Sequence, residues 1–194
     1  MSSPETPQEV EIKFVVNDVT ALETRLRQAG FNQKTRSKRE FNTLYDTPDL
    51  KLRGRGEILR LRKYGDDWTL THKSKGGSGK HKTRVEHETA IPDGAALDPI
   101  LRALGFEPRF TYEKYRAEWT DGRGDVVLDH TPIGHLAEIE GPPDWIDAIA
   151  KLLGVPESEY ITKSYGDLFV DWKLRTGSNA QNMTFAEVGT KDLL

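Results

Sequence analysis

The sequence predicts an α+β protein built mainly of antiparallel β-sheet, and three observations support this. Eight segments alternate apolar and polar residues with a period of two, at residues 9–16, 41–45, 57–63, 67–73, 83–91, 110–119, 124–130 and 135–141. Short turns containing glycine and aspartate join several of these segments, as expected for hairpins. Three other segments have the spacing of amphipathic helices, which can cover one face of such a sheet.

The predicted helices span residues 18–30, 98–105 and 143–154, and each ends at a glycine. Asn17 or Asp18 can cap the first helix, and Asp98 caps the second, with Pro99 at its first helical position. A shorter fourth helix is expected over residues 163–173. The helices are therefore few and peripheral, and the strands dominate.

Residues 9–175 are predicted to form a single domain, because they contain no linker long enough to separate two domains. Residues 1–8 are polar and carry two prolines, so we expect a disordered N-terminus. Residues 176–194 lack a clear period and are expected to be loose or partly helical. The Gly-, Ser- and Lys-rich segment 74–82 is expected to form a mobile loop within the domain.

The composition excludes several classes of protein. The 194 residues include no cysteine, which excludes a disulfide scaffold, a thiol nucleophile and any metal site built on cysteine. The 28 Lys and Arg and 31 Asp and Glu give a formal net charge of −3, which disfavours a nucleic-acid partner. No apolar stretch reaches the roughly 20 residues of a membrane span, and the polar start is no signal peptide. We expect a cytoplasmic protein, either a monomer or a homodimer.

The polar face of the predicted sheet is almost entirely charged. Side chains alternate across a strand, so residues of one parity share a face. Like-charged residues then stand two apart on that face, as in the pairs Glu9/Glu11, Arg60/Arg62 and Glu138/Glu140. Such pairs repel unless opposite charges lie between them. A half-solvated sheet is the simplest interpretation of the alternation, but it does not explain why uncharged polar residues are scarce on this face.

A closed or nearly closed barrel of eight antiparallel strands, with helices packed on the outside, turns the charged face into an interior. Burying so many charges costs roughly several kcal/mol each unless partners are present. Clustered carboxylates suit the hard divalent cations Mg²⁺ and Mn²⁺, whereas clustered Lys and Arg suit a multiply charged anion. The sequence therefore predicts a cavity that binds a metal–polyphosphate complex.

A series of motifs runs in order along residues 9 to 170. The series is Glu9-x-Glu11-x-Lys13, Tyr45-Asp46-Thr47-Pro48, Leu59-Arg60-Leu61-Arg62, Lys73, Arg84-x-Glu86, Glu113-Lys114-x-Arg116, Leu128-Asp129, Glu138-x-Glu140 and Lys163-Ser164-Tyr165. It resembles the signature of the CYTH family, also called triphosphate tunnel metalloenzymes. The members of this family include thiamine triphosphatases, inorganic triphosphatases and class IV adenylyl cyclases.

The resemblance implies a tunnel of eight antiparallel strands and a role for each matching residue. The acids that it assigns to the metal are Glu9, Glu11, Asp129, Glu138 and Glu140. The bases that it assigns to the triphosphate substrate are Lys13, Arg60, Arg62, Lys73, Arg84, Lys114, Arg116 and Lys163. The residues expected to act in catalysis are Glu9, Glu11, Lys13, Glu138 and Glu140. Glu86 and Glu88 are expected to support the bases, and Tyr45-Asp46 to stabilise a turn.

The expected activity is metal-dependent hydrolysis of a triphosphate compound, namely inorganic tripolyphosphate, thiamine triphosphate or a nucleoside triphosphate. The alternative is a class IV adenylyl cyclase, in which the ribose 3′-hydroxyl of ATP replaces water as the nucleophile. Motifs similar to both branches occur, and we favour hydrolysis because no residues that would form an adenine pocket are evident. A non-catalytic module that binds polyphosphate or nucleotide is a second alternative, and nucleic-acid binding through residues 75–84 is a third.

Overall fold

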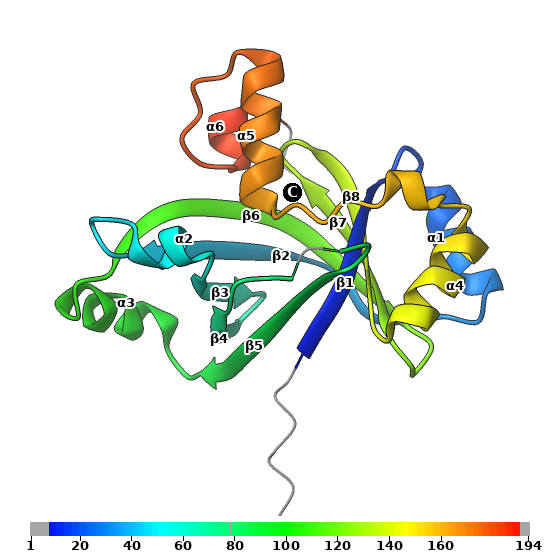
Figure 1. Cartoon of the computed structure of the whole chain (residues 1–194), viewed down its shortest axis with the longest axis horizontal. Coiled ribbons are helices and arrows are strands. Elements are labelled where there is room, and N and C mark those ends of the chain that lie inside the picture. Colours follow the sequence, from blue (N-terminus) through cyan, green and yellow to red (C-terminus); the bar gives the residue numbers. More distant parts are fainter. Residues whose placement is uncertain (1–7, 78, 191–194) are drawn as a thin grey trace, which may run out of the picture.

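The computed structural model describes residues 8–77 and 79–190, and its eight strands form a closed antiparallel barrel (Figure 1). The strands are β1 (Gln8–Val15), β2 (Asn32–Asp46), β3 (Ile58–Tyr64), β4 (Asp67–Lys73), β5 (Lys82–Ile91), β6 (Glu107–Thr120), β7 (Asp125–Thr131) and β8 (Gly134–Glu140). Their order around the barrel is β1-β5-β4-β3-β2-β6-β7-β8, and pairing of β1 with β8 closes the ring. The predicted eight-stranded barrel is confirmed.

Strand β2 begins at Asn32, whereas the sequence pattern predicted a start at residue 41. Residues 32–40 are all polar, so they show no alternation of apolar and polar side chains. They are extended because they pair with β6 from Asn32 opposite Thr120 to Glu40 opposite Lys114, with register shifts along the way. Pairing with a neighbouring strand, and not an apolar face, keeps this half of β2 extended.

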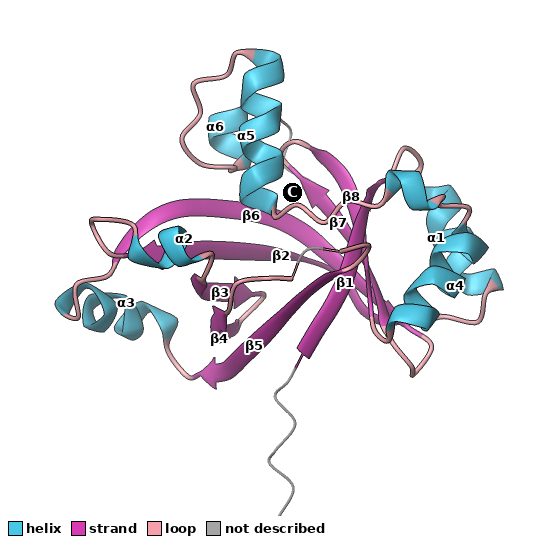
Figure 2. Ribbon diagram, in the orientation of Figure 1, coloured by secondary structure: helices cyan, strands magenta, loops and turns pink. Residues whose placement is uncertain are grey.

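The helices pack on the outside of the barrel (Figure 2). They are α1 (Val19–Gln28), α2 (Lys51–Arg55), α3 (Gly94–Ala103), α4 (Pro143–Leu153), α5 (Tyr165–Thr176) and α6 (Phe185–Val188), with a 3₁₀ turn at Glu157–Glu159. Helices α1 and α4 lie together at one end of the molecule, and α3 lies at the opposite end (Figure 1). None of the helices in the described residues is long and apolar enough to span a bilayer.

Helix α3 starts earlier than the sequence predicted. Asp93 caps it by accepting a backbone hydrogen bond with its carboxylate, so Asp98 is not the cap and Pro99 lies inside the helix. Gly94 allows this start, because a Cβ there would lie 2.1 Å from the ring of Trp68. The first turn of α3 therefore packs closely on Trp68 of β4, and the helix starts nearer the N-terminus than the sequence pattern predicted.

Helix α2 was not predicted, because its five residues include a glycine and are too few to show a period. It is held by Asp46, whose carboxylate accepts hydrogen bonds from the backbone N–H groups of Thr47, Leu52 and Arg53 at 2.7–2.9 Å. The expectation that Tyr45-Asp46 stabilises a turn is thus confirmed for Asp46.

The described part of the C-terminal segment, residues 177–190, packs on β6. Met183 is fully buried, and its backbone N–H and C=O groups bond to Thr111 and Glu113 at 3.0 and 3.1 Å. The backbone N–H of Phe185 donates to the carboxylate of Glu113 at 2.7 Å at the start of α6. The N-terminal residues expected to be disordered lie, except for Gln8, outside the described residues, as do residues 191–194.

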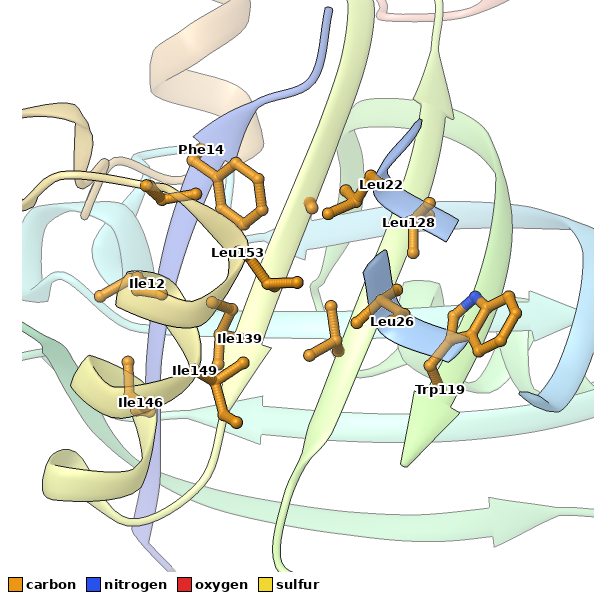
Figure 3. Close-up of a cluster of buried hydrophobic side chains, with 14 of the residues drawn as sticks. Ile12, Phe14, Leu22, Leu26, Trp119, Leu128, Ile139, Ile146, Ile149 and Leu153 are labelled. Carbon is orange, nitrogen blue, oxygen red and sulfur yellow. The ribbon is translucent and has the colours of Figure 1, made fainter. Parts of the chain in front are cut away.

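The main apolar core lies outside the barrel, between strands β1, β6, β7 and β8 and helices α1 and α4 (Figure 3). The core residues labelled in the figure are Ile12, Phe14, Leu22, Leu26, Trp119, Leu128, Ile139, Ile146, Ile149 and Leu153. Smaller clusters contain Phe169 of α5 and Leu101 of α3. The apolar face of the sheet therefore points outwards, which leaves the charged face inside.

Replacing Ile139 by alanine should lower the free energy of unfolding by about 3 kcal/mol, because the side chain is fully buried and its removal leaves a cavity. Leu174→Ala on α5 is the control, since Leu174 is 81% exposed. Its effect should stay below about 0.5 kcal/mol. Urea denaturation measures both values. A loss below about 1 kcal/mol for Ile139→Ala would contradict an external core.

Candidate functional site

The interior of the barrel is a cavity of about 340 Å³, which we call the tunnel. Among the described residues, the acids that line it are Glu9, Glu11, Glu86, Glu88, Glu118, Asp125, Glu138 and Glu140. The bases that line it are Lys13, Arg60, Arg62, Lys73, Lys82, Arg84, Lys114 and Arg116. Acids and bases are equal in number, so the charges of the tunnel walls can balance one another.

The structure brings together in this lining every predicted site residue except Asp129 and Lys163. Lys163 lies outside, where its half-exposed ammonium group forms an ion pair with Asp171 of α5 at 2.5 Å. Ser164 caps α5 directly after Lys163. Lys163 does not belong to the tunnel lining, whereas Ser164 and Tyr165 do, so the position of Lys163 does not support the predicted role in substrate binding.

Asp129 is buried and does not belong to the tunnel lining. Its Oδ2 accepts hydrogen bonds from Lys114 at 2.9 Å, from Arg116 at 2.6 Å and from the hydroxyl of Tyr165, and its Oδ1 accepts one from Arg116 at 2.8 Å. Asp129 thus orients two bases, while its Oδ1 keeps one acceptor site. Its assignment as a metal ligand stays a prediction.

Two arginines of β3 are held by acids of β5. Glu88 accepts hydrogen bonds from Arg60 at 3.4 Å and from Arg62 at 3.1 Å. Glu86 lies 3.0 Å from the ammonium group of Lys73 on β4. Both acids therefore support bases, as the sequence predicted, and these ion pairs give each base a defined orientation.

Lys13 links the acids of β1 and β8. Its ammonium group lies 2.6 Å from Glu11 and 3.2 Å from Glu138, and it is almost completely buried. Lys82 of β5 contacts the same oxygen of Glu11 at 2.9 Å. Although burial acts to raise it, these cations hold the pKa of Glu11 down at about 2. Glu11 is therefore ionised at neutral pH.

Glu140 differs from these acids, because its carboxylate has no ion pair or hydrogen bond with any of the described residues. It lies opposite Glu11 in the register of β1 and β8, next to Glu9 and Glu138. Loss of hydration and repulsion from these three carboxylates raise the pKa of Glu140 to about 7. Burial and the charge of Glu11 also raise the pKa of Glu9, although Lys73 lies 2.7 Å away.

These four glutamates of β1 and β8 fit a hard divalent cation by their chemistry. They present carboxylate oxygens, the ligands that Mg²⁺ and Mn²⁺ prefer, and their mutual repulsion is what a cation would relieve. In the described part of the chain, no three acidic or imidazole side chains converge into a metal site that is already formed. These acids therefore provide suitable ligands for a metal, and two of them, Glu11 and Glu138, form ion pairs with Lys13.

Arg84 of β5 is the clearest unpaired cation among the described residues. Its Nε and Nη1 atoms are buried and lack a hydrogen-bond partner. It lies opposite Glu9 in the strand register, but Glu9 bonds to Lys73 instead. Gly76 packs against it, since a Cβ at that position would lie 3.1 Å from Nε. A buried guanidinium without an anion is an incomplete site for one.

Among the residues of the tunnel and its wall that sequence reasoning missed, three show why it missed them. Lys82 shares the parity of Arg84 on β5, and extending the predicted strand by one residue would have identified it. Tyr165, whose ring lies 4.5 Å from the ammonium group of Lys114, belongs to a motif of the series but received no role. Glu40 lies in the polar half of β2, where no pattern marks a strand.

Comparison with known proteins places the chain in a family. The model of the CYTH domain matches residues 7–165, which is most of the chain. The chain belongs to the CYTH family. The recognition made from the ordered motifs is therefore confirmed, and so is the barrel that this resemblance implies.

This CYTH protein is 26% identical over 171 residues to a putative adenylate cyclase from Methanocaldococcus jannaschii, covering 82% of this chain and 97% of that one. It superimposes on the structure of a putative adenylate cyclase from Vibrio parahaemolyticus with a TM-score of 0.74 and 22% identity, covering 86% and 99% of the two chains. A putative adenylyl cyclase from Hippeastrum, reported with a dominant triphosphatase activity, gives a TM-score of 0.62 and 20% identity, covering 84% and 95%. These structural likenesses support the fold.

The raised pKa of Glu140 predicts a pH-dependent effect of Glu140→Gln in the presence of EDTA. The folded protein keeps this proton up to about pH 7, whereas an ordinary glutamate loses it near 4.5. The proton therefore stabilises the fold below pH 4.5, and this contribution is lost as the pH rises to 7. Glu140→Gln should gain stability over the wild type across this range. The gain should be at most about 1 kcal/mol, because Glu140 loses part of its hydration in the tunnel but keeps an exposed surface where solvent screens its charge.

Urea denaturation at pH values from 4.5 to 8 measures this difference. Leu174→Ala on the surface of α5 is the control, because it changes no titratable group, and it should show no such trend with pH. A difference between Glu140→Gln and the wild type that stays constant over the whole range would contradict the crowding of carboxylates.

Proposed function

We propose that this protein is a metal-dependent hydrolase of triphosphate compounds, with inorganic tripolyphosphate, thiamine triphosphate or a nucleoside triphosphate as substrate. The observation that carries the proposal is the convergence of eight acids and eight bases on one enclosed tunnel in the described residues. A polyanion alone would use only the bases, and a metal alone only the acids. Both sets together support a metal–triphosphate complex as the ligand.

The bases of neighbouring walls would bind the phosphate oxygens. Arg60 and Arg62 on β3 and Lys114 and Arg116 on β6 lie on strands that flank β2. Guanidinium groups suit phosphate because two parallel N–H groups can bond to two oxygens. The acids that hold these bases reduce the ordering needed when substrate binds, which lowers the entropic cost of binding.

Glu9, Glu11, Glu138 and Glu140 would hold the divalent cation, for which Mg²⁺ and Mn²⁺ are the candidates. When bound, such a cation supplies neutralisation of phosphate charge and a water of lowered pKa. Lys13 lies between two of these acids, and despite its burial they raise its pKa, so it stays protonated. It can therefore bind a phosphate oxygen but cannot act as a general base.

Hydrolysis requires in-line attack of water on the terminal phosphorus and stabilisation of the charge that develops on the leaving diphosphate. The bases of β3 and β6 provide that stabilisation because they are fixed in a site of low hydration. Arg84 can bind the anion without breaking an existing ion pair, so we assign it a main role in affinity. Such an activity on soluble phosphates fits the cytoplasmic location expected from the sequence.

An adenylyl cyclase is the second candidate, because the Methanocaldococcus relative is named as one. In that reaction the ribose 3′-hydroxyl of ATP attacks the α-phosphorus and diphosphate leaves. Hydrolysis is preferred for two reasons. Among the described residues, the tunnel lining is mostly charged, with few apolar side chains to hold adenine. The Hippeastrum neighbour shows that a protein named as a cyclase can act mainly as a triphosphatase.

Separate measurement of each product tests the proposal. Purified protein is incubated with tripolyphosphate, thiamine triphosphate or ATP, each with Mg²⁺, Mn²⁺ or EDTA, while orthophosphate, diphosphate and cyclic AMP are quantified. Orthophosphate released only with a metal supports the hydrolase. Cyclic AMP with equimolar diphosphate as the main products of ATP would identify a cyclase. Binding of a triphosphate without any product would leave a non-catalytic binding module.

Arg84→Ala should weaken tripolyphosphate binding by roughly 10- to 100-fold, because one charge-assisted contact is lost. Its melting temperature should not fall, since Arg84 has no carboxylate partner among the described residues to leave unpaired. Calorimetric titration in EDTA measures the affinity. Lys163→Ala is the matched control outside the tunnel and should change the affinity less than about twofold. Equal affinities of Arg84→Ala and the wild type would argue against the assigned anion site.

Glu138→Gln should lower kcat by about 100-fold or more, because a carboxylate that would hold the cation becomes neutral. The fold should persist, since Arg116 keeps its bonds to Asp129 and Lys13 its bond to Glu11. Initial rates and circular dichroism check both statements. Asp171→Asn on the outer surface of α5 is the control and should retain the wild-type rate. A Glu138→Gln variant with more than about a tenth of that rate would exclude this role.

A further inference from the structure

Glu40 is a fully buried acid that the proposed mechanism does not use. Its side chain has no exposed surface, and it does not belong to the tunnel lining. It lies on β2, the strand between β3 and β6, and therefore between the strands that carry Arg60 and Arg62 on one side and Lys114 and Arg116 on the other. Glu40 thus sits behind the bases, within the tunnel wall.

The contacts of Glu40 with Lys114 and Arg116 are longer than those that Asp129 makes with the same two bases. Its Oε1 accepts a hydrogen bond from Asn42 at 2.9 Å and lies 3.4 Å from the ammonium nitrogen of Lys114. Its Oε2 has no hydrogen-bond partner and lies 3.7 Å from Nε of Arg116. Asp129, by contrast, bonds directly to both of these bases. Glu40 therefore acts on the bases through its charge more than through hydrogen bonds.

A buried carboxylate with an unpaired oxygen is costly unless its charge interacts favourably with neighbouring groups. Here the neighbours are four cations, because Lys114, Arg116, Arg62 and Arg60 all favour the ionised form and hold the pKa of Glu40 at about 2 in spite of its burial. These cations repel one another. A negative charge between the two pairs reduces that repulsion.

We propose that Glu40 is a positioning residue, a fixed counter-charge that holds the bases of β3 and β6 at the spacing needed to bind the triphosphate. The inference rests on the proposed function, since it concerns how those bases meet the substrate. Because Lys114 and Arg116 make only long contacts with Glu40, they can form hydrogen bonds to phosphate and still remain beside Glu40. The same charge opposes an incoming anion, so it lowers affinity while it improves geometry.

Glu40→Gln tests this inference, because glutamine keeps the shape of the side chain and removes its charge. We expect the variant to bind tripolyphosphate at least threefold more tightly than the wild type in EDTA, while kcat with metal falls at least tenfold. Loss of the negative charge of Glu40 strengthens binding of the anionic substrate. Bases that are no longer held at the right spacing stabilise the transition state less well, which lowers kcat. A purely structural role would weaken binding together with stability, so the direction of the change in affinity separates the two.

Two control variants accompany the measurement. Glu40→Asp keeps the charge and should keep the wild-type affinity within twofold. Glu113→Gln changes a buried acid of β6 that faces outwards, where it pairs with Arg39, and should lower the melting temperature without changing the affinity.

If Glu40→Gln does not fold, the double variant with Lys114→Gln removes one cation together with the anion. It should then recover a folded protein, and failure to do so would overturn the inference.

The outcomes separate this inference from the proposed function. A wild-type protein that neither binds nor hydrolyses tripolyphosphate would overturn both. If the wild type binds and hydrolyses it, but Glu40→Gln binds it no more tightly or keeps its kcat, the inference alone is overturned. Tighter binding with a reduced kcat, and wild-type affinity in Glu40→Asp, would support it.

Discussion

Neutralisation of charge inside a closed sheet is the constraint on which the rest of this structure depends. The barrel has its apolar face outside and its charged face inside, the reverse of an ordinary barrel with a packed interior. The outward face is stable only because amphipathic helices cover it. The inward face is stable only because acids and bases alternate around it, as in the pairs of Arg116 with Asp129 and Lys13 with Glu11.

The groups that this pairing leaves unsatisfied indicate what the tunnel is built to receive. Arg84 is a buried cation without an anion among the described residues, and Glu140 is a carboxylate surrounded by other carboxylates. Arg84 thus forms no ion pair with an anion among the described residues, and Glu140 forms no ion pair with a cation among them. An anion that arrives together with a cation supplies both, whereas either one alone would leave a group unpaired. These two groups therefore support a ligand that has both an anionic and a cationic part, as proposed.

Much of the fold and of the candidate site could be predicted from the sequence, because parity along a strand assigns each charged side chain to a face. That rule predicted that Arg60, Glu138 and most of the other charged residues share one face, and they line the same tunnel. It gave no signal where both faces are polar, as in the first half of β2, and so it missed Glu40. It also gives no information beyond the strands, where Lys163 pairs with Asp171 outside the tunnel lining. These positions depend on pairing and capping between distant segments, which no local pattern records.

The way the ring closes also bears on how the protein reaches its native state. Strand β1 pairs with β5 and with β8, so the partners of the first strand lie about 75 and 125 residues further along the chain. Contacts so distant in sequence form slowly, since a long loop must be closed before they stabilise anything. Glu9, Glu11 and Lys13 all lie on β1. The barrel therefore closes in the same step in which the charged residues of β1 join the tunnel lining. A nascent chain that does not yet include β8 has neither the closed barrel nor the complete tunnel lining.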